Sequence, residues 1–227
     1  MKKISFLIFI IFFQLSLTSA VLLKDKNSKK KSDYEKLFDG KKYQTAAGGF
    51  ITIHKIGAKL YFELPLKMMD RELLLTSAIT QSSDNNTCIN GYKADPLHFR
   101  FAKNDSLVYL RKINTSFIPQ EDFDSRMKGL IDQNFSDPFL EKFKIVAYNK
   151  DSSAVVFETT NLMLNISEPY LAPISRGNEH VEITPSFNKT LSTVRSIKSF
   201  DDNISVVCQF GGRYSTQVNN VNTVKDA

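Results

Sequence analysis

A strict alternation of apolar and polar residues is the feature that most constrains the fold of this chain. Ile51 and Ile53 alternate with polar residues, a turn follows at Gly57-Ala58, and every second residue from Leu60 to Leu66 is apolar. Successive side chains of a β-strand point to opposite faces of a sheet, so a period of two is typical of strands that bury one face. The pattern therefore predicts a β-hairpin here.

Three further hairpins are predicted by the same pattern. The first has strands at 97–101 and 107–113 and a turn at 103–106. The second has strands at 142–148 and 153–159 and a turn at 149–152. The third has strands at 190–197 and 204–210 and a turn at 200–203. Residues 72–80 form an additional strand candidate. Because each hairpin buries only one face, serial hairpins build a curved antiparallel sheet or a sandwich. The sequence thus predicts a mainly β fold with a minor helical part, a β-rich α+β class.

One segment near residues 121–134 departs from this alternation. Its apolar residues, from Phe123 to Ile131, recur at positions i, i+4, i+7 and i+8, and acidic residues precede them. This spacing is typical of an amphipathic helix of about three turns. Shorter helical turns are expected at 33–38 and 161–164.

The amino terminus has the layout of a secretory signal peptide. Lys2 and Lys3 precede an apolar stretch, and small residues occupy positions Thr18 and Ala20. This layout predicts cleavage after Ala20 and export to the periplasm, the outer surface or the exterior. A transmembrane anchor is the alternative, but the apolar run is shorter than the roughly 20 residues that a bilayer span requires. No transmembrane anchor is therefore expected after cleavage.

Lysines cluster directly behind the expected cleavage site. Residues 21–42 hold eight lysines and four acidic residues, whereas residues 43–227 hold 20 basic and 20 acidic residues. A nucleic-acid-binding domain would carry its basic residues on the fold itself, so the distribution argues against that class and no nucleic-acid partner is expected. A solvated tether is the expected role of this run, with weak attraction to anionic surfaces as the alternative.

The expected domain organisation follows from these segments. Residues 1–20 are the signal peptide, 21–42 a lysine-rich linker, 43–214 a β-rich non-catalytic domain, and 215–227 a polar tail.

The two cysteines, Cys88 and Cys208, leave two interpretations open. An oxidising compartment would permit a disulfide between them. Because Cys208 shares a strand face with Ile204 and Val206, a buried unpaired thiol is the alternative. Two thiols without a CxxC spacing indicate neither a zinc ribbon nor a redox motif.

Familiar catalytic motifs are missing from the sequence. None of the histidines His54, His98 and His180 lies in an HExxH motif, and neither a GxSxG elbow nor a glycine-rich phosphate loop occurs. His98 and Arg100 share the polar face of a predicted strand and are candidates for binding, with ordinary surface exposure as the alternative. The same surface interpretation applies to His54. No catalytic, cofactor-binding or metal-binding residue is predicted.

An ordered series of short motifs resembles a known family. The series is DYEKLF at 33–38, GFITIHK at 49–55, GAKLYFELP at 57–65, RELLL at 71–75, PLHFRF at 96–101 and SIKSF at 196–200. Taken together over roughly residues 33–214, it resembles the N-terminal region of the exported zinc-dependent metallopeptidases of Bacteroidetes-type bacteria. In that family a short module and a domain of unknown function precede a zincin domain that carries HExxH.

The resemblance implies a non-catalytic accessory domain of such a peptidase, in a truncated or split gene product. The family's zinc ligands and general-base glutamate lie beyond the region represented here, so no catalytic residue is carried over and zinc is expected only in the missing catalytic domain. The implied partners are a peptidase catalytic domain or a peptide or protein substrate. A free-standing exported binding or interaction protein is the alternative, and an enzyme with a site of its own is a third hypothesis.

Overall fold

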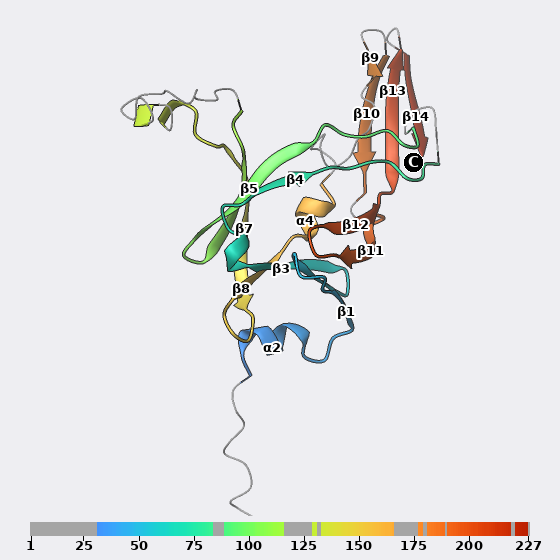
Figure 1. The fold of residues 1–227 in the computed structure, drawn as a ribbon. Coiled ribbons are helices and arrows are strands. Elements are labelled where there is room, and N and C mark those ends of the chain that lie inside the picture. Colours follow the sequence, from blue (N-terminus) through green and yellow to red (C-terminus); the bar gives the residue numbers. More distant parts are fainter. Residues whose placement is uncertain are drawn as a thin grey trace, which may run out of the picture. The chain divides into compact units, whose positions relative to one another are not determined.

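The structure is a computed structural model of the whole chain. It describes residues 31–83, 89–115, 129–130, 133–165, 177–178, 181–188, 190–218 and 221–226. Every named helix and strand lies within the unit Asp33–Ala227 (Figure 1).

The described elements follow one another mostly as strands. In chain order they are α2 (Asp33–Phe38), β1 (Tyr43–Ala46), β2 (Thr52–Ile56), β3 (Lys59–Pro65), the 3-10 turn η1 (Leu66–Met68), β4 (Glu72–Leu75), β5 (Leu97–Asn104), β6 (Leu107–Lys112), β7 (Phe139–Tyr148), β8 (Ala154–Glu158), α4 (Thr160–Met163), β9 (Gly177–Asn178), β10 (Val181–Phe187), β11 (Thr193–Ser199), β12 (Ile204–Gln209), β13 (Gly212–Val218) and β14 (Val221–Asp226). The predicted β-rich class is confirmed.

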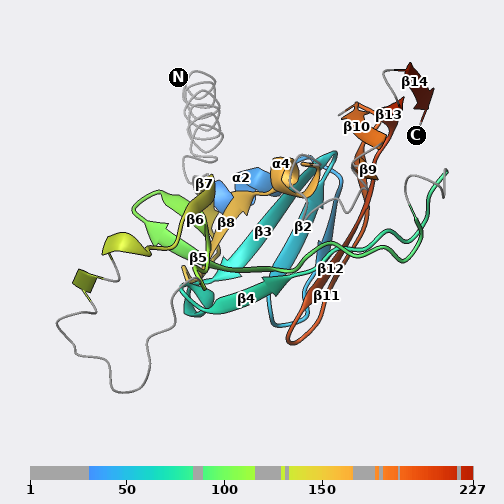
Figure 2. The same cartoon turned by 90° about the horizontal axis from the view of Figure 1, so that it is seen from above.

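Eight strands form one antiparallel sheet in the order β1-β2-β3-β8-β7-β6-β5-β4. The four hairpins predicted from the alternation are confirmed as β2–β3, β5–β6, β7–β8 and β11–β12. The pairings of β6 and β8 with β7 both contain a register shift. Such bulges bend a strand and increase its twist, and the sheet curls accordingly (Figure 2).

The main hydrophobic core lies on one face of this curled sheet. Phe101 of β5, Phe143 of β7 and Phe157 of β8 meet there, with the Phe157 ring centroid 5.6 Å from that of Phe101 and 5.1 Å from that of Phe143. Burial of a phenylalanine side chain stabilises a fold by about 1.5–3 kcal/mol. The core therefore ties the β5–β7 part of the sheet to the β2–β3–β8 part.

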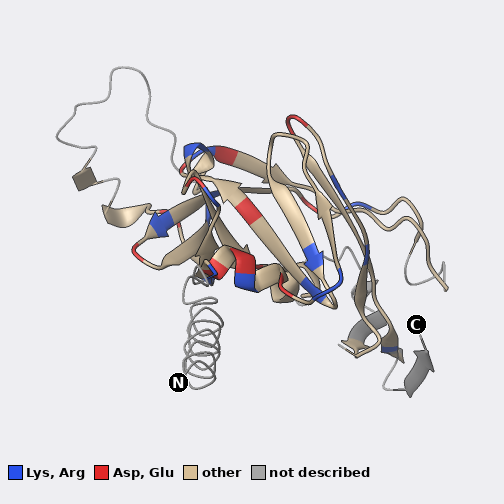
Figure 3. Cartoon of the chain, turned by 90° about the horizontal axis from the view of Figure 1, so that it is seen from below, with Lys and Arg blue, Asp and Glu red and all other residues tan. Residues whose placement is uncertain are grey.

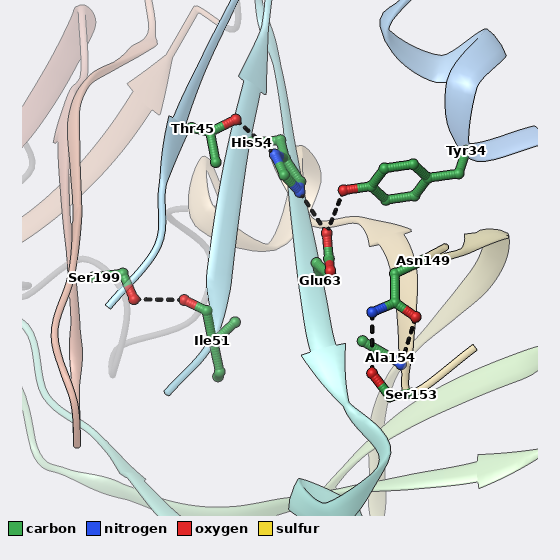
Figure 4. Close-up of polar contacts among 9 residues, drawn as sticks. All are labelled: Tyr34, Thr45, Ile51, His54, Glu63, Asn149, Ser153, Ala154 and Ser199. Carbon is green, nitrogen blue, oxygen red and sulfur yellow. Dashed lines mark hydrogen bonds and ion pairs between the residues drawn. The ribbon is translucent and has the colours of Figure 1, made fainter. Parts of the chain in front are cut away.

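The β11–β12 hairpin attaches to the segment that leads into β2. The Ser199 hydroxyl donates a hydrogen bond of 2.7 Å to the Ile51 carbonyl (Figure 4). It also accepts a hydrogen bond of 3.1 Å from the Gly48 amide. A Cβ atom on Gly48 would lie 2.3 Å from the Ser199 carbonyl carbon. Only glycine allows this close approach of the two backbones.

The opposite face of the sheet carries a second, smaller core under α2. Tyr34, Leu37 and Phe38 of α2 pack against Ile56, Tyr61, Ala147 and Val156 from the sheet. Three of six helical residues thus face the sheet, while acidic residues occupy the first helical turn, where they complement the helix dipole.

The structure differs from the expected boundaries at both ends of the domain. The short helix α2 lies inside the expected linker 21–42, although the helical turn itself was predicted. At the other end, residues of the expected polar tail 215–227 complete β13 and form β14, which pair antiparallel beside β10. Valine and threonine favour strands, so backbone pairing forms here without the apolar alternation that marks the other strands.

Both short helical turns that the sequence predicts are present, at 33–38 and near 161–164, whereas the longer helix near 121–134 is largely untested. The turn near 161–164 is confirmed as α4. The amphipathic helix near 121–134 lies mostly outside the described residues, which include only 129–130 and 133–134 of it, and it stays a prediction. In the part of the chain that is described, no helix is both long enough and apolar enough to cross a membrane.

Candidate functional site

A buried polar cluster links α2 to the first strands of the sheet. His54 of β2 is only 3% exposed, and Glu63 of β3, 14% exposed at its side chain, lies beside it. Strand register pairs His54 with Tyr61 and Thr52 with Glu63, so His54 and Glu63 are diagonal neighbours on the face that α2 covers. Tyr34 of α2 completes the cluster from above the sheet.

Each polar group of this cluster has a partner at hydrogen-bond distance (Figure 4). His54 Nε2 lies 2.9 Å from Glu63 Oε2, His54 Nδ1 lies 2.9 Å from Thr45 Oγ1, and the Tyr34 hydroxyl donates to Glu63 Oε2 at 2.8 Å. An ionised carboxylate only accepts hydrogen bonds, so Nε2 carries a proton. In the neutral imidazole Nδ1 then accepts from the Thr45 hydroxyl. The ring of Phe38 packs edge-on against the ring of His54, with the two ring centroids 4.9 Å apart.

The electrostatics of the cluster favour an ionised Glu63 and a protonated Tyr34. The hydrogen bond from His54 lowers the pKa of Glu63 below its ordinary value of 4.5, although burial opposes this, and hydrogen bonds from Tyr34 and Asn149 lower it further. Burial first, and then Glu63, raise the pKa of Tyr34. The two shifts support one arrangement, in which phenol and imidazole both donate to the carboxylate.

Carboxylate, imidazole and phenol groups are also the components of general acid–base catalysis. In this cluster, however, they join β1, β2, β3 and α2 to one another. The prediction that His54 is an ordinary surface residue is wrong. The alternation placed His54 correctly on the non-core face, but α2 covers that face and buries it.

The binding candidates His98 and Arg100 lie on the face of β5 that points away from the main core. Both point away from the main core on β5, where the burial pattern alternates as predicted. His98 Nε2 lies 3.0 Å from Glu72 Oε2, and Arg100 Nη2 lies 2.6 Å from Asp137 Oδ2. Both side chains are thus engaged by acidic neighbours, and their role in binding stays a prediction.

Asp137 organises this second polar cluster, and sequence reasoning missed it. Its side chain is 12% exposed, binds Arg100, and accepts a 2.9 Å hydrogen bond from the Asn114 amide. Its backbone carbonyl accepts two hydrogen bonds from Arg111, whose guanidinium lies 4.6 Å from the centre of the Phe139 ring. Nothing in the local sequence pattern indicates that Asp137 meets Arg100, because Arg100 lies on β5 and Asp137 lies far along the chain, in the segment that precedes β7.

Of the two cysteines, only Cys208 lies among the described residues. Cys208 packs half-buried against the main core on the same strand face as Ile204 and Val206, and burial raises the pKa of its thiol to about 11. Cys88 lies outside the described residues, so the disulfide between Cys88 and Cys208 stays a prediction.

The described residues do not fit a zinc site. Among them, no group of three or more His, Cys, Asp or Glu side chains is arranged so that it could hold a metal ion. Both ring nitrogens of His54 are engaged by Thr45 and Glu63, and His180 lies outside the described part of the chain.

Charged residues are interspersed over the described strands. Lysine and arginine positions are scattered among aspartate and glutamate positions, and neither sign forms a continuous stripe in this view (Figure 3). This distribution agrees with the balanced charge of residues 43–227.

The fold and its polar clusters define a β-rich domain built around one curled antiparallel sheet. Comparison with protein families finds two matches, a domain of unknown function (DUF5118) over residues 31–82 and a domain of unknown function (DUF5117) over residues 91–222. The second match covers more than half of the chain, which therefore belongs to the DUF5117 family. Neither match links the chain to zinc metallopeptidases. No match was found among the curated proteins or among the solved structures.

The two family segments build the eight-stranded sheet jointly. The first segment contributes β1, β2 and β3 at one end of the sheet and β4 at the other end, while β8, β7, β6 and β5 of the second segment lie between them. The junctions are the β3–β8 and β4–β5 pairings. A sheet with this strand order is complete only when both segments are present.

Proposed function

We propose that this chain is the non-catalytic N-terminal accessory domain of an exported zinc metallopeptidase. The match of a short domain followed by a larger one, both of unknown function, is compatible with the order that the resembling peptidases have. The observation that carries the proposal is that the two family segments build one eight-stranded sheet, because this makes them one accessory unit.

The side-chain chemistry supports a non-catalytic role for this unit, because its polar groups are used in contacts within the fold. Its buried acid, imidazole and phenol groups connect α2 to β1, β2 and β3, and its Asp137 cluster connects β5 and β6 to β7. In the proposed protein, zinc is held by the HExxH residues of a separate catalytic domain. The partners are that catalytic domain or its peptide or protein substrate, and the location is outside the cytoplasm.

The gene itself provides the first test. We expect the DNA downstream of codon 227 to encode a zincin domain with HExxH, either in frame or after a frameshift. An unrelated downstream gene would instead favour a free-standing protein.

A direct assay tests whether the chain lacks an active site of its own. The purified mature chain should cleave an unfolded substrate such as reduced casein no faster than a heat-denatured sample of the same chain, and it should not retain zinc stoichiometrically. Stoichiometric zinc together with proteolysis that a chelator abolishes would contradict the proposal.

A free-standing exported binding protein is the second candidate function. It is favoured by the stretch of sheet around His98 and Arg100, where charged and aromatic side chains remain partly exposed outside the area that α2 covers. Under this alternative the same domain acts without a catalytic partner, and only the gene test separates the two candidates.

A further inference from the structure

The two edges of the eight-stranded sheet differ in how they are covered. Near the β1 edge, the segment between β1 and β2 is bonded to the β11–β12 hairpin through Gly48, Phe50 and Ile51. At the other edge, β4 pairs with β5 on one side, and no strand among the described residues pairs with its other side. An open edge presents unpaired backbone groups to a potential partner strand.

The register shows which backbone groups of β4 point outward. The His98 carbonyl accepts from the Ile113 amide on the β6 side, whereas the Phe101 carbonyl accepts from the Asp70 amide on the β4 side. Backbone groups alternate in direction along an antiparallel strand, so β5 bonds to β4 through Phe99 and Leu97. Their partners are Leu73 and Leu75, and the amides and carbonyls of Glu72 and Leu74 therefore face the open edge.

The composition of this edge favours pairing. Natural edge strands are usually protected by lysine, proline or a bulge. Glu72 is the one charged residue of β4, and residues 73–80, which read LLLTSAIT, contain neither a charge, a proline nor a glycine. Exposed and partly buried residues alternate strictly from Glu72 to Thr80, and the Leu74 side chain is 64% exposed.

We propose that the open edge of β4 binds an extended peptide strand of a partner protein by strand addition. Backbone bonds to Glu72 and Leu74 supply the affinity, and alternate apolar side chains of the peptide pack beside Leu73 and Leu75, which are only half-buried against the core. This inference goes beyond the proposed function, because it rests on the sheet edge alone and requires no catalytic domain.

The structure favours a peptide over a second copy of this chain. A stable dimer interface typically buries about 800 Å² on each partner around an apolar centre. On β4 itself the only strongly exposed apolar side chain is Leu74, and Glu72 beside it is already engaged by His98. Strand addition requires no such apolar centre, since main-chain bonds supply most of the attraction.

The test measures binding of a defined probe to the full mature chain. The probe is a fluorescein-labelled peptide of alternating valine and threonine with a lysine at each end, and its twin carries an N-methyl group on every valine and threonine. Fluorescence anisotropy gives the Kd of each peptide for the unaltered chain and for Leu74→Pro, Leu74→Lys and the control Val207→Lys. Val207 is an exposed apolar residue of β12, a strand that pairs with β11 and belongs to a different sheet from β4.

We expect the unmethylated peptide to bind and its twin to bind at least about tenfold more weakly, since each lost hydrogen bond costs roughly 1 kcal/mol. Leu74→Pro removes an outward amide that the β4–β5 ladder does not use, so it should weaken binding by a similar factor without lowering the melting temperature. Should Leu74→Pro unfold, the Kd of Leu74→Lys takes its place, because a charge at an edge strand opposes pairing and should likewise weaken binding. Val207→Lys should leave Kd unchanged within about twofold.

Three results would overturn the proposal. The first is no binding of the unmethylated peptide, and the second is equal binding of the methylated twin or of the folded Leu74 variants. The third is a concentration-dependent dimer that Leu74→Pro abolishes, which would assign the edge to a second copy of the chain.

Discussion

At the scale of single residues, buried polar groups of this domain serve to attach one segment of the chain to another. One carboxylate oxygen, Glu63 Oε2 on β3, is bonded both to Tyr34 of α2 and to His54 of β2. A buried carboxylate requires such partners, because an unpaired buried charge is strongly destabilising. The hydrogen bond from Tyr34 to Glu63 therefore attaches α2 to the sheet.

The first residue-scale prediction concerns Glu63→Gln. The pKa of Glu63 is lower in the folded chain than the ordinary value of 4.5, so the unfolded chain binds more protons in acid. The stability that Glu63 contributes is present above about pH 4.5 and is lost as pH falls through the lower folded pKa. Urea unfolding should show that Glu63→Gln is about 1 kcal/mol less stable than the unaltered chain at pH 7, and that this difference shrinks toward pH 3.

Glu72→Gln is the matched control, because Glu72 is exposed and its bond to His98 is solvated. It should change the free energy of unfolding by less than about 0.5 kcal/mol at pH 7. A pH-independent difference for Glu63→Gln would contradict the proposed ionised cluster.

The second residue-scale prediction concerns Gly48→Ala. The added Cβ would lie 2.3 Å from the Ser199 backbone, so either the Gly48 segment or the β11–β12 hairpin has to move. We expect a loss of about 1–3 kcal/mol in the free energy of unfolding. Gly129→Ala, where the added Cβ meets nothing within 4 Å, serves as the control and should not destabilise the chain. Equal stability of the two variants would argue against the close contact.

At the scale of elements, local pairings could be predicted and distant ones could not. The hairpin β5–β6 closes over the turn Asp105-Ser106, so alternation on both sides of that turn suffices to identify it. The β3–β8 pairing joins Tyr61 to Glu158, and no periodicity in either strand specifies its partner. For the same reason the polar faces of single strands could be predicted, but the contact of Arg100 with Asp137 could not.

Asp137→Ala tests how β7 is attached to β5 and β6. The variant removes the carboxylate that binds the partly buried Arg100 guanidinium and accepts from the Asn114 backbone amide. We expect the free energy of unfolding to fall by about 2 kcal/mol in a urea titration. Lys59→Ala, which removes an exposed ion pair with Glu158, should cost less than about 0.5 kcal/mol, and a comparable cost for both variants would argue against the role of Asp137.

The expected signal peptide gives a prediction for the N-terminal element. A chain expressed with its own N-terminus in a Gram-negative host should appear outside the cytoplasm with Val21 as its first residue. Intact-mass measurement of the exported protein checks this directly. Ala20→Arg should block cleavage, because the peptidase pocket accepts only small residues. Retention of Met1 in the unaltered exported protein would support an uncleaved anchor instead.

At the scale of the whole molecule, two family segments form one sheet. Strand order interleaves them, since β1–β3 and β4 of the first segment flank the strands of the second on both sides. The main core likewise contains Phe62 from the first segment beside Phe157 from the second, with ring centroids 6.3 Å apart. Sequence alone indicated a single domain over residues 43–214, but only the strand order explains why neither segment could form this sheet by itself.

The most direct test of this account is the folding of residues 89–227 expressed alone. Without β3 and β4, the strands β8 and β5 become open edges and the main core loses Ile53, Leu60, Phe62 and Leu64. We predict a poorly dispersed amide NMR spectrum and no cooperative thermal transition, with both restored when residues 31–83 are co-expressed as a separate chain. A well-dispersed spectrum and cooperative unfolding of residues 89–227 alone would contradict the account.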